Sequence, residues 1–154
     1  MNSFYQQVKI KFKNRPVFIS ATLLFVLLIF LSFSRLLLNV TYYEDVNVFI
    51  PEARHGITSL IFLYGGYLHF IPRLFALIVR ACESFASHQF VIVLMCAGVY
   101  AFSFGQLVSH RYRWLIESDG LRLLLVLTFA FVPGVDSIYG NLANIHTVLF
   151  MGWA

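Results

Sequence analysis

Long apolar runs separated by short polar segments dominate the sequence. Residues 17–38 form the first run, and residues 89–109 form a second that contains no formally charged side chain. A helix of about 20 apolar residues crosses the hydrocarbon core of a bilayer. Shorter apolar runs at 72–85 and 121–133 predict two further crossings. A last run, 144–154, predicts the start of a fifth.

Composition supports lipid as the solvent for much of the chain. Of its 154 residues, 60% are hydrophobic and 12% are charged, and the mean hydropathy is +0.80. Soluble domains carry roughly 25% charged residues, and a small soluble protein cannot hide this much apolar surface. We therefore expect an all-α integral membrane protein with about four transmembrane helices and the start of a fifth. A basic lead, residues 1–16, precedes the membrane domain, residues 17–154. The apolar ending predicts the N-terminal part of a longer protein.

Basic residues suggest how the chain is oriented in a membrane. Four of them come just before the first apolar run, namely Lys9, Lys11, Lys13 and Arg15. Such a cluster predicts a cytoplasmic N-terminus. Counting three crossings from the inside then places the loop 110–120 outside, whereas its Arg111 and Arg113 favour the inside. If 60–85 re-enters the membrane instead of crossing it, the loop lies inside. The aromatic residues lie within the apolar runs, so no nucleic-acid partner is expected.

The outer segment, residues 39–71, carries the first candidate site. Its apolar positions predict short interfacial helices divided at Pro51, with an irregular stretch at 60–71. Glu44 and Asp45 stand next to each other near the predicted membrane boundary. Partial desolvation there raises the pKa of a carboxyl group, which suits a general base. Asp45 is alternatively a ligand for a divalent cation, because such ions prefer oxygen ligands. A solvated acidic loop is the remaining interpretation.

A basic group begins the predicted second crossing. It consists of Tyr67, His69 and Arg73, and it follows the pair Gly65-Gly66, whose residues tolerate positive φ. His69 and Arg73 are four residues apart and would share one face of a helix. Because arginine binds phosphate oxygens bidentately, this face suits a lipid phosphate. Contact with ordinary lipid headgroups is the alternative.

A third polar group precedes the last apolar run. It contains Asn141, Asn144 and His146, whose amides and imidazole suit sugar hydroxyls or a phosphate. Asn144 is alternatively the N-cap of the following helix, since asparagine is favoured there.

Three short motifs give the sequence a family resemblance. They are YEDVNVF (43–49), YGGYLHFIPRL (64–74) and GNLANIH (140–146). They resemble motifs of poorly characterised bacterial multi-pass membrane proteins, and the layout resembles the start of GT-C-type glycosyltransferases. The resemblance implies sugar transfer from a polyprenyl-phosphate donor to a glycan, lipid or protein acceptor at the outer face of a bacterial plasma membrane. It implies Asp45 or Glu44 as the catalytic carboxylate, and His69 and Arg73 as ligands of the donor phosphate. The acidic and basic groups should then meet across the outer loop.

Two other classes of function remain open. GT-C enzymes contain about twice as many helices, so the short chain also fits a small non-enzymatic membrane subunit or assembly factor. The Gly/Pro interruption between 65 and 72 also fits a fragment of a transporter or flippase.

Overall fold

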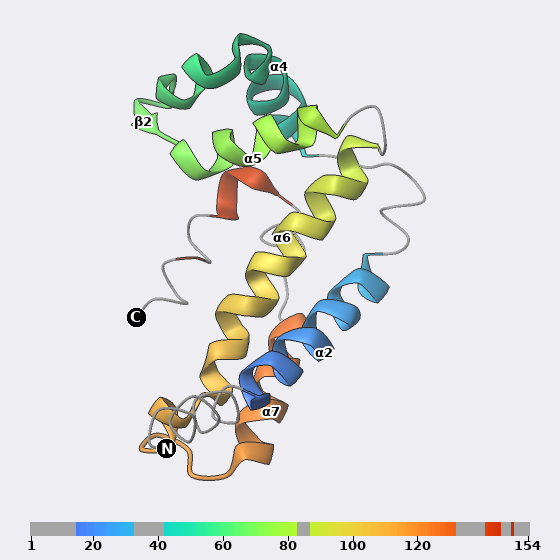
Figure 1. Cartoon of the computed structure of the whole chain (residues 1–154), viewed down its shortest axis with the longest axis vertical. Helices are drawn as coiled ribbons and strands as arrows, with labels where there is room; N and C mark the ends of the chain where they lie inside the picture. Colours follow the sequence, from blue (N-terminus) through green and yellow to red (C-terminus); the bar gives the residue numbers. More distant parts are fainter. Residues whose placement is uncertain (1–14, 33–41, 83–86, 132–140, 146–148, 150–154) are drawn as a thin grey trace, which may run out of the picture.

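The longest helix forms the axis of the molecule (Figure 1). In this computed structural model the described residues are 15–32, 42–82, 87–131, 141–145 and 149. Helix α6 (His88–Gly105) begins at Ser87, whose hydroxyl accepts the N–H of Phe90 at 3.3 Å, and continues into the 3₁₀ turn η3 (Gln106–Val108). The side chains of α6 are mostly apolar on every face of the helix, which favours burial or contact with lipid.

Helix α2 (Arg15–Leu31) runs antiparallel beside α6. Small residues allow the two helices to approach closely, since Gly105 lies directly against Ala21. The hydroxyl of Ser20 also donates to the carbonyl of Gly105 at 3.1 Å. Helix α7 (Asp119–Thr128) and the turn η5 (Phe129–Phe131) complete a hydrophobic cluster with α2 and the second half of α6.

A cap of short elements covers the other end of α6 (Figure 1). We define the cap as residues 45–81, which form η1 (Asp45–Phe49), α4 (Ile50–Glu52), η2 (Ala53–Ile61), β1 (Leu63–Tyr64), β2 (Tyr67–Leu68) and α5 (Phe70–Ala81). The cap packs on the first turns of α6, where Ala76 and Val79 join Val91, Ile92 and Cys96 in a second hydrophobic cluster. The short turn η6 (Leu142–Asn144) also contributes to this cluster.

The cap helices were predicted to be divided at Pro51, but the structure divides them elsewhere. Pro51 stands in the first turn of α4, directly after the π-helical turn η1, where it is accommodated. The chain instead changes direction at Gly56, which has φ 63° and ψ −143°. Helices do lie flat across the end of α6, and the stretch 60–71 contains a small antiparallel hairpin.

The prediction of four membrane-crossing helices is wrong. Within the described residues, a single helix, His88–Val108, is long and apolar enough to cross a membrane, and Pro16–Leu31 is apolar but shorter. The predicted second crossing, 72–85, overlaps α5, whose 12 residues extend about 18 Å against a hydrocarbon core of about 30 Å. The predicted fourth crossing, 121–133, overlaps α7, which has 10 residues. Their apolar side chains pack partly against neighbouring helices, so hydropathy alone overestimated the number of spans.

The predicted fifth crossing, 144–154, lies outside the described residues except for positions 144, 145 and 149. The basic loop 110–120 lies at the same end of α6 as the start of α2, and the cap lies at the other end (Figure 1). Residues 60–81 thus stay within the cap at that end of α6.

Candidate functional site

Asp45 lies in the first turn of η1 and is fully buried. Both of its carboxylate oxygens accept the backbone N–H of Leu142, at 3.1 and 3.2 Å. Burial raises the pKa of Asp45 to about 7. The N–H of Leu142 opposes that shift, the charge of Glu44 adds to it, and the N–H of Ala143 again opposes it. Asp45 thus joins the cap to a segment near the end of the described chain and titrates close to neutral pH.

Glu44 precedes Asp45 and is half-buried. It serves as the N-cap residue of η1 with helical backbone angles. Of the two predicted catalytic carboxylates, Glu44 is therefore the more exposed.

Arg73 lies on α5 and is 1% exposed. Its Nη1 forms an ion pair with Glu52 of α4, and its guanidinium carbon lies 5.6 Å from the ring centre of Phe49 and 5.7 Å from that of Phe62. Among the described residues, no acceptor is found for its Nε and Nη2. A buried guanidinium with two nitrogens that lack an acceptor favours binding of an additional acceptor such as an anion.

His69 is the residue before α5 and packs against two aromatic rings. Its ring centre lies 5.8 Å from that of Phe49 and 5.7 Å from that of Tyr64. Tyr67 stands in β2 with its side chain exposed. His69 and Arg73 thus belong to the core of the cap, whereas Tyr67 belongs to its surface.

The third predicted group is only partly described. Asn141 is buried and caps η6, because its side-chain oxygen accepts the N–H of Ala143 at 2.8 Å. Asn144 ends the same turn and is half-buried. His146 lies outside the described residues.

The three predicted groups converge in one part of the fold. Asp45 holds the turn that contains Asn144, and Phe49, one helical turn after Asp45, contacts both His69 and Arg73. The acidic and basic groups do not pair as predicted, because Asp45 is bound to Leu142 and Arg73 to Glu52. The role of Glu52 was not predicted, because no sequence pattern links it to Arg73, 21 residues later.

The described residues contain no group of three or more His, Cys, Asp or Glu side chains that could hold a metal ion. A divalent cation at Asp45 therefore stays a prediction from the sequence. The structure does contain a groove of about 400 Å³ between α2 and α6, lined mostly by apolar residues such as Phe25 and Phe102. This groove lies away from the cap and its polar groups.

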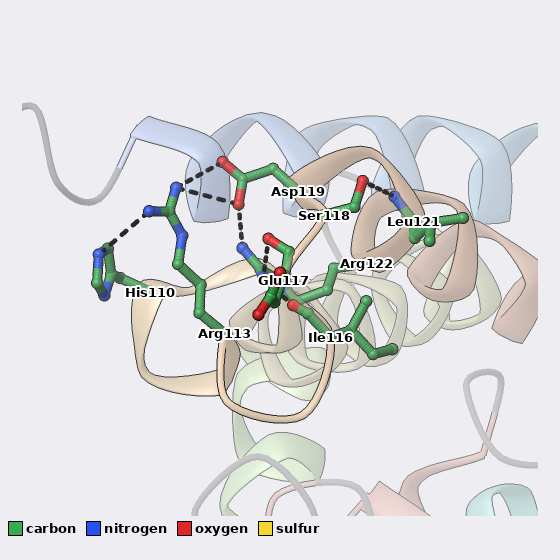
Figure 2. A network of polar contacts seen from close by, with 8 residues as sticks. All are labelled: His110, Arg113, Ile116, Glu117, Ser118, Asp119, Leu121 and Arg122. Carbon is green, nitrogen blue, oxygen red and sulfur yellow. Dashed lines mark hydrogen bonds and ion pairs between the residues drawn. The ribbon is translucent and has the colours of Figure 1, made fainter.

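A separate polar network occupies the opposite end of the molecule (Figure 2). Arg113 donates to both carboxylate oxygens of Asp119, at 3.3 and 3.0 Å, and to the ring of His110 at 3.3 Å. Arg122 is buried, and it contacts Asp119 and the carbonyl oxygens of Ile116 and Glu117. Hydrogen bonding from Arg113 holds the pKa of Asp119 below its ordinary value. This network fixes the loop between α6 and α7.

Comparisons of the chain with known protein families, with curated proteins and with solved structures gave no match.

Proposed function

We propose that this chain is the N-terminal region of a membrane glycosyltransferase that takes its sugar from a polyprenyl-phosphate donor. The observation that carries the proposal is the convergence of three polar groups at one end of α6. Asp45 bonds to Leu142 across 97 residues of sequence, and Phe49 connects the helix of Asp45 to His69 and Arg73. Sugar transfer from a phosphate donor uses a carboxylate as general base and a cationic group to stabilise the departing phosphate. Both kinds of group lie in this part of the fold.

A membrane location is the second part of the proposal. It is supported by the hydrophobic composition, by the length of His88–Val108, and by large apolar side chains exposed along α2 and α6, such as Phe18, Phe30 and Phe102. The start of α2 at Arg15 and the loop 110–120, which carries Arg111 and Arg113, lie at one end of the molecule, which we assign to the cytoplasm. The cap then faces outward, and the N-terminus is cytoplasmic.

In the proposed reaction, Glu44 takes the proton of an acceptor hydroxyl. The hydroxyl oxygen forms a bond to the anomeric carbon of the sugar, and the bond from that carbon to the donor phosphate breaks. The electron pair leaves with the polyprenyl phosphate, so the configuration at the anomeric carbon inverts. Asp45 is a positioning residue, since its carboxylate holds the 141–145 segment against the cap.

Arg73 suits the leaving phosphate. Its Nε and Nη2 lack an acceptor among the described residues, while Glu52 and two aromatic rings fix the guanidinium in place. Donors held in position before the reaction stabilise the charge that develops on a departing phosphate.

A small non-enzymatic membrane subunit is the second candidate. It is favoured by one observation: Asp45 and Arg73 are both buried and already engaged, the first with Leu142 and the second with Glu52. Under this alternative both residues serve the stability of the cap and no substrate reaches them.

Sugar transfer in membranes separates the two candidates. Vesicles from cells that express the full-length protein are given polyprenyl-phosphate sugars radiolabelled in the sugar, and label on the acceptor fraction is counted. Glu44→Gln should reduce transfer by about 10² or more, the usual size of a general-base contribution. Glu117→Gln, at an exposed position at the opposite end, is the matched control and should keep it. Equal transfer by Glu44→Gln and the control would refute the enzymatic role of Glu44.

A further inference from the structure

The hairpin in the cap is built around two glycines. Gly65 and Gly66 have φ 59° and 84°, and they connect strands in which Leu63 pairs with Leu68 and Tyr64 with Tyr67. Two central residues with positive φ define the tight turn that suits a two-residue hairpin. The two glycines therefore fix the register of the hairpin, and with it the side chains on each of its faces.

The two faces of the hairpin have different surroundings. Tyr64 points into the cap, where its ring centre lies 5.6 Å from that of Phe49. Leu63 and Leu68 pair directly across the strands on the opposite face, and they are 67% and 55% exposed. In an antiparallel pair with one face in water, that outer face is ordinarily polar. Here it is apolar.

Exposed apolar side chains also flank the hairpin in the sequence. Ile57, Ile61 and Phe70 are exposed, as is Tyr67 on the other face, and residues 56–72 contain no Asp, Glu, Lys or Arg. Apolar surface of this extent is uncommon on soluble monomers and marks an interaction site. The nearest charged side chain before this stretch is Arg54, which is exposed.

The position of the hairpin identifies its partner. The cap packs on Val91 and Ile92, in the first turns of the helix His88–Val108, so it lies where that helix would leave a bilayer (Figure 1). Farther along the same helix, Phe102 is exposed as a lipid-facing residue would be. The cap that contains the hairpin therefore lies near the bilayer surface at which this helix would emerge.

We propose that the Leu63–Leu68 face of the hairpin inserts into the outer leaflet of a lipid bilayer and anchors the cap at the membrane interface. The inference rests on the membrane location proposed above. Insertion stops at the interface, because the outer edges of two-residue strands carry backbone groups that lack partners in hydrocarbon. Tyr67 fits this depth, since tyrosine is enriched at membrane–water boundaries. The anchor would hold the cap at the level of lipid-linked phosphates.

The test places an environment-sensitive fluorophore on single cysteines of the full chain. In a Cys82→Ala/Cys96→Ala background, Leu68→Cys and Leu63→Cys report the hairpin, Phe102→Cys reports the helix, and the exposed Asn47→Cys reports the solvent side of the cap. The labelled proteins are reconstituted in phosphatidylcholine–phosphatidylglycerol vesicles that contain lipids spin-labelled near the headgroup or deep in the acyl chain.

We expect blue-shifted emission at positions 63 and 68, quenched more by the shallow spin label than by the deep one. Position 102 should be quenched by the deep label and position 47 by neither. Quenching at 102 without quenching at 63 and 68 would overturn the anchor and leave the membrane location intact. No quenching at any position would overturn the membrane location itself. A blue shift that grows with protein concentration, without lipid quenching, would show that a second copy of the chain covers the hairpin.

Discussion

The carboxylate of Asp45 accepts the backbone N–H of Leu142, a residue 97 positions later in the chain. This contact brings a turn near the end of the described chain against the helix that opens the cap. Because the carboxylate is fully buried, the energy of the contact depends on its protonation state.

Asp45→Asn should flatten the pH dependence of stability. The folded pKa is about 7 and the ordinary value 3.8, so between these values the folded chain keeps a proton that the unfolded chain releases. The stabilising contribution is thus complete below about pH 4 and is lost as the pH rises through about 7. Its slope is at most about 1.4 kcal/mol per pH unit. Thermal unfolding in detergent at a series of pH values measures it, with Glu117→Gln as the control. If Asp45→Asn leaves this slope unchanged, Asp45 does not have the raised pKa.

Glu52→Gln should destabilise the cap more than a double variant that also removes Arg73. Arg73 is almost fully buried, and its ion pair with Glu52 compensates its charge. Removing one partner of a buried pair costs about 3–5 kcal/mol. Glu52 is 34% exposed, so we expect about 1–3 kcal/mol for Glu52→Gln. Glu52→Gln/Arg73→Met should recover part of this loss of unfolding free energy. If the two changes are additive, the ion pair does not stabilise the fold.

Gly105→Ala should separate α2 from α6. A Cβ at position 105 would lie 2.9 Å from the Cβ of Ala21, closer than such atoms approach. Overpacking of this kind costs about 1–3 kcal/mol. Gly98→Ala is the matched control on the same helix, because its Cβ would meet only the ring of Phe25, at 3.9 Å. The midpoint of thermal unfolding in detergent measures the effect of each variant. A decrease for Gly98→Ala as large as that for Gly105→Ala would contradict the close contact between α2 and α6 at Gly105.

Asp119→Asn should loosen the loop between α6 and α7. Asp119 accepts hydrogen bonds from Arg113 and Arg122, and Arg122 is buried (Figure 2). Because the folded pKa of Asp119 is lowered, its stabilising contribution is present above its ordinary value of 3.8 and is lost as the pH falls through the folded value. Limited proteolysis at neutral pH should cleave the variant faster near position 114, whereas Glu117→Gln should be cleaved like the wild type. Equal rates for both variants would argue against the network.

Local signals in the sequence predicted parts of the fold well. The uncharged run 89–109 gave the central helix, and the pair Gly65-Gly66 indicated positive φ, which the hairpin requires. Hydropathy failed for 72–85 and 121–133, because α5 and α7 use their apolar residues for packing between helices. A hydropathy pattern does not distinguish a side chain that faces lipid from one that faces another helix.

The candidate site was predicted as a set of residues and not as a set of contacts. The sequence pointed to Asp45, Arg73 and Asn141, and the structure places all three at one end of α6. Their partners depend on tertiary packing. Glu52 reaches Arg73 only because α4 lies against α5, and Leu142 reaches Asp45 only because η6 folds back on the cap.

The most direct test of the account is the side of the membrane on which each end of α6 lies. Asn47→Cys in the cap and Trp114→Cys in the basic loop are both exposed positions, and both are made in the Cys82→Ala/Cys96→Ala background. A membrane-impermeant maleimide is then added to intact cells. We predict that position 47 is labelled at once and that position 114 is labelled only after the membrane is permeabilised. Labelling of both positions from the same side would contradict the crossing by α6 and the outward-facing cap on which the proposed function depends.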